Sequence, residues 1–144
     1  MKIITISIFV LFKCFFVIGQ DNFTIIVNDT MKSKVRIEKD NITGTKTLFH
    51  VIVNCDTLNE YNVYTYDFQI QNNNDTSLYF MRVCWGEPFF CPSYSNDTIK
   101  KGQIKLLRYR CMTQFHPGAF SKTANVRTNL GDFNITFKGR IIPK

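Results

Sequence analysis

Apolar and polar residues alternate with a period of two along most of the chain, and polar turns interrupt the alternation every ten residues or so. A period of two places successive side chains on opposite faces of an extended strand, and no stretch shows the sustained period of an amphipathic helix. The pattern therefore predicts an all-β fold. About eight short antiparallel strands favour an immunoglobulin-like sandwich of two sheets, with a small barrel as the alternative.

Each predicted strand has one apolar face, which we expect to point inward. In the last strand Phe133, Ile135 and Phe137 share the inner parity, and Asn134 has the outer one. The pair Gly131-Asp132 predicts a tight hairpin before it. The predicted strands are residues 23–27, 35–37, 45–55, 64–70, 78–84, 103–111, 119–130 and 133–142.

The first 19 residues are typical of a secretory signal peptide. Lys2 precedes an apolar run from Ile3 to Phe12, and cleavage is expected after Gly19 or, as the alternative, after Gln20. A membrane anchor needs about 20 uninterrupted apolar residues, and Lys13 interrupts this run. Cleavage would leave one domain, residues 20–144, and lower the net charge from +7 to +5 because two lysines are lost. We expect a protein that is secreted or lies in the lysosomal lumen.

Four cysteines remain after cleavage, and an even number in an oxidising compartment favours two disulfides. Cys84 and Cys91 bracket only six residues, which predicts a local bridge. Cys55 would then pair with Cys111, since both fall on the apolar parity of their strands. A zinc site is the alternative, but the cysteines lack the paired spacing of zinc ligands.

Six Asn-x-Thr sequons are consistent with a protein that passes through the secretory pathway. Any strand that carries one is expected to turn that asparagine to solvent. The candidate glycosylation sites are Asn22, Asn28, Asn41, Asn74, Asn96 and Asn134.

The charged and catalytic residue types suggest a binding protein rather than an enzyme. A basic stretch could meet anionic lipids or acidic glycans, although a solvated strand face beside its connecting loop is the preferred interpretation. No nucleic-acid-binding motif is present, so we expect no nucleic-acid partner. His50 and His116 stand apart from any nucleophile or carboxylate pair, so we expect no catalysis, metal or cofactor. The basic stretch contains Lys100, Lys101, Lys105, Arg108 and Arg110.

The second half of the chain resembles the ML family of lipid-recognition proteins. The resemblance rests on the run Cys84-Trp-Gly-Glu-Pro-Phe-Phe-Cys91-Pro92, then Gly102, then Pro117-Gly118-Ala119-Phe120, and a final hairpin that ends at Ile141. The chain departs from the family because it lacks the cysteines usual near the two ends of the mature protein, and residues before Phe80 match only in length and strand pattern.

The resemblance implies a lipid ligand, such as a sterol, a fatty acyl chain or a glycolipid, held in a cavity between the sheets. Aromatic side chains would suit such a pocket because they offer large apolar contact. On this hypothesis strand parity assigns the lining to Phe49, Val51, Tyr64, Tyr66, Phe68, Leu107, Tyr109, Phe133 and Phe137. The expected rim comprises Trp85, Phe89 and Phe90, with Lys100, Lys101 and Lys105 beside an anionic headgroup. The favoured alternative is that the three aromatic rings pack onto the end of the sandwich.

The alternative function is an extracellular interaction module or secreted effector with a filled core that acts through its loops. Its partners would be a membrane surface or a receptor protein. A tightly packed interior favours this alternative over the lipid carrier.

Overall fold

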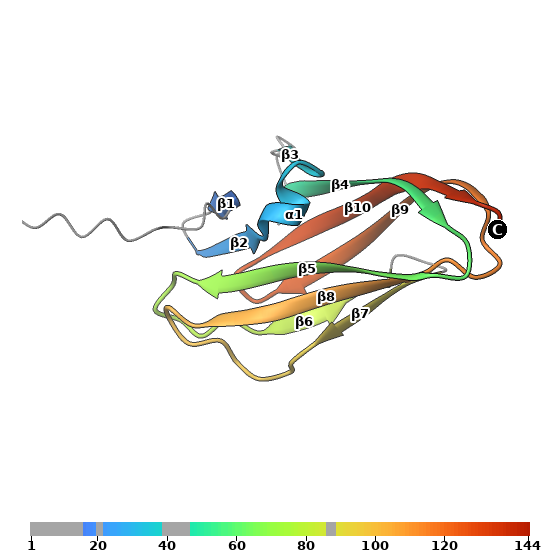
Figure 1. The fold of residues 1–144 in the computed structure, drawn as a ribbon. Coiled ribbons are helices and arrows are strands. Elements are labelled where there is room, and N and C mark those ends of the chain that lie inside the picture. The colour runs from blue at the N-terminus through green and yellow to red at the C-terminus, as the bar shows by residue number, and fades with distance from the viewer. Residues whose placement is uncertain (1–15, 20–21, 39–46, 86–88) are drawn as a thin grey trace, which may run out of the picture.

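The chain folds into two five-stranded β-sheets packed face to face (Figure 1). This computed structural model describes residues 16–19, 22–38, 47–85 and 89–144. Sheet 1 has the order β1 (Phe16–Gly19), β2 (Phe23–Val27), β5 (Val63–Asn72), β8 (Ile104–Met112), β7 (Phe90–Tyr94). Sheet 2 has the order β3 (Val35–Glu38), β4 (Thr47–Asn59), β10 (Gly131–Ile142), β9 (Gly118–Thr128), β6 (Phe80–Val83). One short helix, α1 (Asp29–Lys32), connects β2 to β3.

The seven strands from β4 to β10 follow the connectivity of an immunoglobulin-like sandwich. If they are taken in sequence as strands A to G, sheet 1 contains B, E and D, and sheet 2 contains C, F and G. The strand in place of A, β4, pairs with β10 instead of β5 and does so in parallel. The predicted two-sheet sandwich is therefore confirmed, with this parallel pair as an exception to the antiparallel order.

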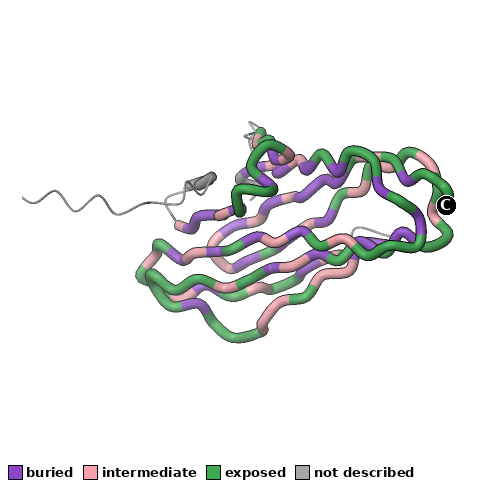
Figure 2. Tube along the Cα trace, in the orientation of Figure 1, coloured by how far each residue is buried: buried purple, intermediate pink, exposed green. Residues whose placement is uncertain are grey.

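Strand parity determines the core, as the alternation predicted. Phe23, Ile25 and Val27 on β2 are fully buried, and so are Phe133, Ile135 and Phe137 on β10. Buried and exposed residues alternate along most strands in Figure 2. The buried side chains of the two inner faces form one continuous apolar cluster between the sheets.

A β-bulge interrupts β4 at Cys55. The register moves from the pair Lys138 and Asn54 directly to the pair Gly139 and Asp56, which leaves Cys55 without a partner. Asp56 has a positive φ of 56°. A Cβ on Gly139 would lie 2.8 Å from the Asp56 carbonyl oxygen, so the bulge requires glycine at this position.

Several elements differ from the prediction. The expected strand 78–84 is reduced to β6, with an isolated bridge between Leu78 and Ile99 before it. Neither α1 nor β7 was predicted. Asn28 caps α1 by accepting a hydrogen bond from the backbone N–H of Met31. The expected signal peptide covers β1 and residues 1–15, which lie outside the described residues; β1 itself pairs with β2 at the edge of sheet 1.

Candidate functional site

The residues predicted to line a lipid cavity all face the interior, where they pack against one another. The rings of Phe49 and Phe133 stack with centroids 5.3 Å apart, and Phe137 stacks on Phe90 at 4.2 Å. Tyr109 also contacts Phe137, at 5.3 Å. Phe90 and Tyr109 thus contact Phe137 across the two sheets, whereas Phe49 and Phe133 are cross-strand neighbours within sheet 2. The other predicted lining residues, Val51, Tyr66, Phe68 and Leu107, are buried and Tyr64 is half-buried.

One apolar hollow reaches the edge of this core. It has a volume of about 230 Å³ and lies between β4 and β5, beside α1. β2 pairs only with the second half of β5, and β3 only with residues 50–53 of β4, so both sheets are uncovered at the same place. Its lining includes Met31, Lys34, Cys55, Asp56, Leu58, Tyr64 and Tyr66.

The predicted rim does not assemble. Phe89 and Phe90 are buried, because their rings pack against Phe120 instead of projecting from a loop. Trp85 is exposed just after β6. Lys100 and Lys101 precede the start of β8, whereas Phe90 pairs with Cys111 near its far end, so the two halves of the expected rim lie apart. Lys105 is half-buried on β8.

All four described cysteines are free thiols, so neither expected disulfide is present. Cys84 directly follows β6 of sheet 2, whereas Cys91 lies on β7 of sheet 1, and the Cys84 carbonyl accepts a hydrogen bond from the Tyr109 hydroxyl. Cys55 and Cys111 do face the core, as predicted. Burial raises the pKa of the Cys55 thiol to about 11, partly opposed by its hydrogen bond with Tyr66, and raises that of Cys111 to about 12.

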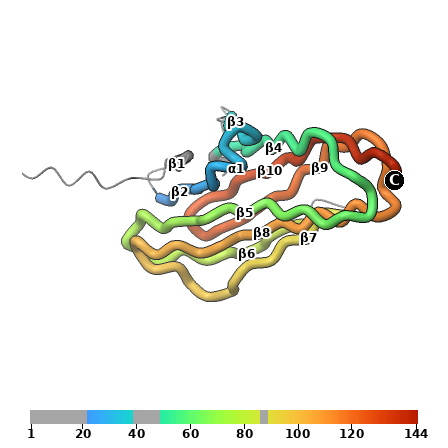
Figure 3. Tube along the Cα trace, in the orientation of Figure 1, coloured from blue at the N-terminus to red at the C-terminus, as the bar shows by residue number. Residues whose placement is uncertain are grey.

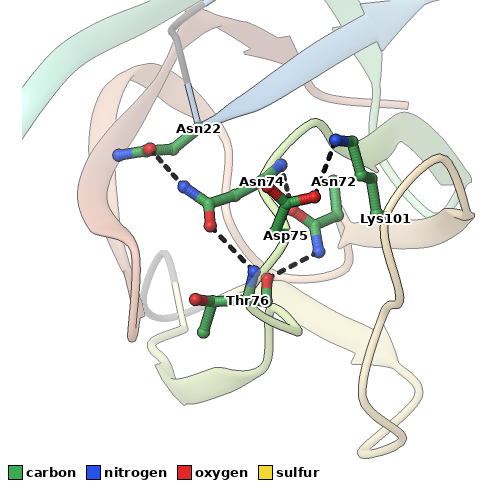
Figure 4. Close-up of polar contacts among 6 residues, drawn as sticks. All are labelled: Asn22, Asn72, Asn74, Asp75, Thr76 and Lys101. Carbon is green, nitrogen blue, oxygen red and sulfur yellow. Dashed lines mark hydrogen bonds and ion pairs between the residues drawn. The ribbon is translucent and has the colours of Figure 1, made fainter.

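Two of the sequon asparagines belong to one hydrogen-bonded cluster at the turn after β5 (Figure 4). The Asn74 amide donates to the side-chain oxygen of Asn22 at 2.8 Å, and Thr76 N–H donates to Asn74. The fully buried Asn72 accepts from Asn74 N–H and donates to the Thr76 and Ile99 carbonyls. Lys101 donates to Asp75 at 2.7 Å, which lowers the pKa of that carboxyl. These bonds join the β5–β6 turn to the loop before β8.

The remaining sequons differ in exposure. Asn28 and Asn96 are exposed, whereas Asn134 is half-buried on the outer face of sheet 2 and accepts from Asn125. Asn134 thus points outward, as predicted. Asn41 lies outside the described residues.

The two histidines have separate, ordinary surroundings. His50 Nε2 lies 2.5 Å from the Thr136 hydroxyl on the outer face of sheet 2, and the His116 ring packs against Phe89 at 4.9 Å. Within the described ranges, no three His, Cys, Asp or Glu side chains gather as metal ligands would.

An exposed apolar cluster occupies one end of the sandwich, where the β4–β5 turn, the β8–β9 turn and the C-terminus meet (Figure 1). Tyr61 and Phe115 are 52% and 71% exposed, and their rings meet edge to face at 5.7 Å. Val63 and Met112 are cross-strand partners beneath them and are also exposed. We call these four residues the aromatic end.

Both rings of the aromatic end project from a strained backbone. Tyr61 has a φ of 62° and Phe115 a φ of 61°, a region that bulky L-residues rarely adopt. Such conformations persist only where surrounding contacts enforce them, and they concentrate at functional sites. The strain therefore distinguishes these two residues from other exposed apolar side chains.

Thr113 holds the two turns together. It is fully buried, and its hydroxyl shares one proton between the Asn59 and Asn62 carbonyls at 2.8 and 2.9 Å, while its oxygen accepts from Asn62 N–H at 3.0 Å. Its own N–H donates to the Asn62 carbonyl. The two turns that carry Tyr61 and Phe115 are thus hydrogen-bonded to each other through Thr113.

Each ring of the aromatic end borders a hollow. Tyr61 lines one of about 190 Å³, and Phe115 lines one of about 280 Å³ toward β9. An exposed ring beside a hollow is a shape to which a partner surface can bind. The second hollow is lined by Phe89, Phe115, His116, Pro117, Ala119, Phe120 and Lys122.

No helix in the described part of the chain is long and apolar enough to span a bilayer. No family model matches the chain, so the resemblance to the ML family rests on the quoted residues alone. No curated protein matches it either.

Comparison with solved structures supports the sandwich fold. A protein of unknown function from Porphyromonas gingivalis W83 superposes with a TM-score of 0.53 at 13% identity, over 74% of this chain and 46% of that one. The chain thus spans about half the length of that protein. PapD-like domain 7 of human CEP192 gives a TM-score of 0.49 at 11% identity, over 77% of this chain and 87% of that domain. At such identities the likeness concerns the fold alone.

Proposed function

We propose that this protein is a non-catalytic interaction module of the extracellular space or the lysosomal lumen, and that it binds its partner through the aromatic end. The observation that carries the proposal is the pair Tyr61 and Phe115, exposed on strained backbone and held by Thr113. Aromatic anchors displayed from a rigid unit contribute much of the affinity at protein surfaces, because little conformational freedom is lost on binding.

The filled interior also supports a binding surface over a binding cavity. Tyr66 and Tyr109 on sheet 1 contact Phe137 on sheet 2, so a ligand between the sheets at this place would have to displace packed rings. Exposed apolar groups that a folded protein does not need for its core are the better candidates for recognition.

The test is binding of the purified protein to cells of the organism that produces it. Phe115→Ser is expected to weaken binding at least about tenfold, as loss of an anchor residue does. Ile104→Ser is the matched control, because Ile104 is 47% exposed and begins β8 at the opposite end of the molecule. Equal losses in both variants, or none in Phe115→Ser, would contradict the proposal.

The lipid carrier implied by the ML resemblance is the second candidate, and the hollow beside Cys55 is the observation that favours it. Its volume of about 230 Å³ lies below the range usual for pockets that enclose a whole small ligand, although a short acyl segment could enter. Native mass spectrometry of protein purified from its source checks this candidate. A stoichiometric lipid that survives Phe115→Ser but is lost in Leu58→Trp would favour the carrier.

A further inference from the structure

The aromatic end combines an apolar tip with a fringe of positive charge. Arg110 lies on the outer face of sheet 1, one same-face step from Met112, and its cross-strand partner is Thr65. Lys122 lines the same hollow as Phe115. Arg140 lies on β10 opposite Ala119, which lines that hollow too. The three cations therefore surround the tip on separate elements.

No acidic residue in the described ranges forms an ion pair with Arg110, Lys122 or Arg140. Among the described residues, the ion pairs occupy other cations: Lys34, Arg36, Lys101, Arg108 and Arg127. Within the two turns the acidic residue is Glu60, which is only 8% exposed. A partner that meets this end must accept apolar rings at its centre and offer negative charge around them.

We propose that the partner of the aromatic end is an anionic lipid surface, with Tyr61 and Phe115 inserted at the headgroup level and Arg110, Lys122 and Arg140 in contact with the headgroups. This inference rests on the proposed function and names the partner class for the same site. Amphipathic rings favour the membrane interface, and each nearby cation strengthens attachment to anionic lipid. The two turns that carry the rings lie at one end of the sandwich (Figures 1 and 3), so the rings can enter the interface while the sheets remain in water.

The first test is flotation of the full chain with phosphatidylcholine vesicles that contain about a third phosphatidylserine. We expect binding that weakens in high salt, and much weaker binding to phosphatidylcholine alone. Arg110→Gln, Lys122→Gln and Arg140→Gln should each reduce binding about fivefold. Lys100→Gln removes the same charge at the opposite end and should change binding little. Equal losses for Lys100→Gln and the three fringe variants would overturn the inference.

The second test measures whether the side chain at position 115 enters the lipid bilayer. The chain has a single tryptophan, Trp85. A Phe115→Trp variant in a Trp85→Phe background should shift its emission to the blue when phosphatidylserine vesicles are added, whereas the wild-type Trp85 emission should not. An unshifted Trp at position 115 would contradict insertion.

The two proposals fail separately. Binding to cells that depends on Phe115 but is abolished when protease strips the cell surface, together with no binding to vesicles, would identify a protein partner. That result would overturn the membrane inference and leave the interaction module standing. Vesicle binding that persists in Phe115→Ser would overturn the inference as well.

Discussion

Phe115 illustrates how a single residue is held against its backbone preference. A φ of 61° costs a residue with a Cβ on the order of 1–2 kcal/mol, and glycine avoids that cost. We expect Phe115→Gly to be more stable to urea than Phe115→Ala by about 0.5–1 kcal/mol. Both variants lose the ring equally, so the comparison isolates the backbone. At an unstrained site the order is reversed, and that result would show that the turn relaxes.

The buried thiols of Cys55 and Cys111 predict a loss of stability in alkali. Their pKa values are raised to about 11 and about 12 in the folded state, whereas an unfolded cysteine has a pKa of about 8.5–9. Between these values the unfolded chain has released protons that the folded chain still holds, so the free energy of unfolding falls as pH rises from about 9 to 11.

Urea unfolding across that range, compared with a Cys55→Ala variant, measures the effect. The wild type is expected to lose stability more steeply than the variant. Identical slopes, or a disulfide at Cys55 found by peptide mapping without reduction, would contradict the prediction.

At the scale of single elements, the β4 bulge is the most constrained feature. A Cβ at Gly139 would lie 2.8 Å from the Asp56 carbonyl oxygen and 2.9 Å from Phe120 Cζ, and the backbone oxygen cannot move aside. We expect Gly139→Ala to destabilise the protein by about 2–3 kcal/mol in thermal or urea unfolding. Gly102→Ala is the control, because Gly102 has a φ of 78° with nothing within 4 Å. A loss no larger than in the control would mean that steric crowding is unimportant.

The hydrogen bonds of Thr113 between the β4–β5 and β8–β9 turns give a prediction that links stability to binding. Thr113→Val keeps the shape of the side chain but removes the hydroxyl that bonds Asn62 N–H and the Asn59 carbonyl, while the Asn62 carbonyl keeps its bond from the Thr113 N–H. We expect a loss of about 1–3 kcal/mol in unfolding free energy and weaker cell binding, since the two rings are no longer displayed together. If Thr113→Val is destabilised but binds cells as well as the wild type, the Thr113 hydrogen bonds are not needed to position the two rings.

Strands with clear alternation were predicted almost to the residue, because parity alone determines which side chains are buried. β2 coincides with the predicted segment, and β8 and β10 differ by one or two residues. β7 was missed because Phe90 and Cys91 were assigned to the loop between the two cysteines, and the polar residues that follow begin with Pro92. Proline is tolerated there because β7 is the edge strand of sheet 1 and pairs only with β8. The parallel pairing of β4 with β10 could not be predicted, because the alternation of apolar and polar residues in a strand does not depend on the direction of its neighbour.

For the whole molecule, the sequence predicted which residues form the core but left open whether a cavity or a filled interior lies between the sheets. Parity correctly turned Phe49, Phe133 and Phe137 inward, yet it contains no information on the distance between two sheets. The aromatic end was missed for a related reason. The exposure of Tyr61 and Phe115 depends on positive φ angles in two distant turns, and neither residue is the glycine or asparagine that normally indicates such a conformation.

The central claim is that the molecule meets its partner with the aromatic end. A photo-activatable phenylalanine analogue at position 115, and separately at position 104, tests it most directly when the protein is irradiated on cells of its source. We predict an adduct from position 115 that is lost when Tyr61→Ser is added, and none from position 104. Equal adducts from the two positions would place the contact elsewhere on the sandwich and contradict the account.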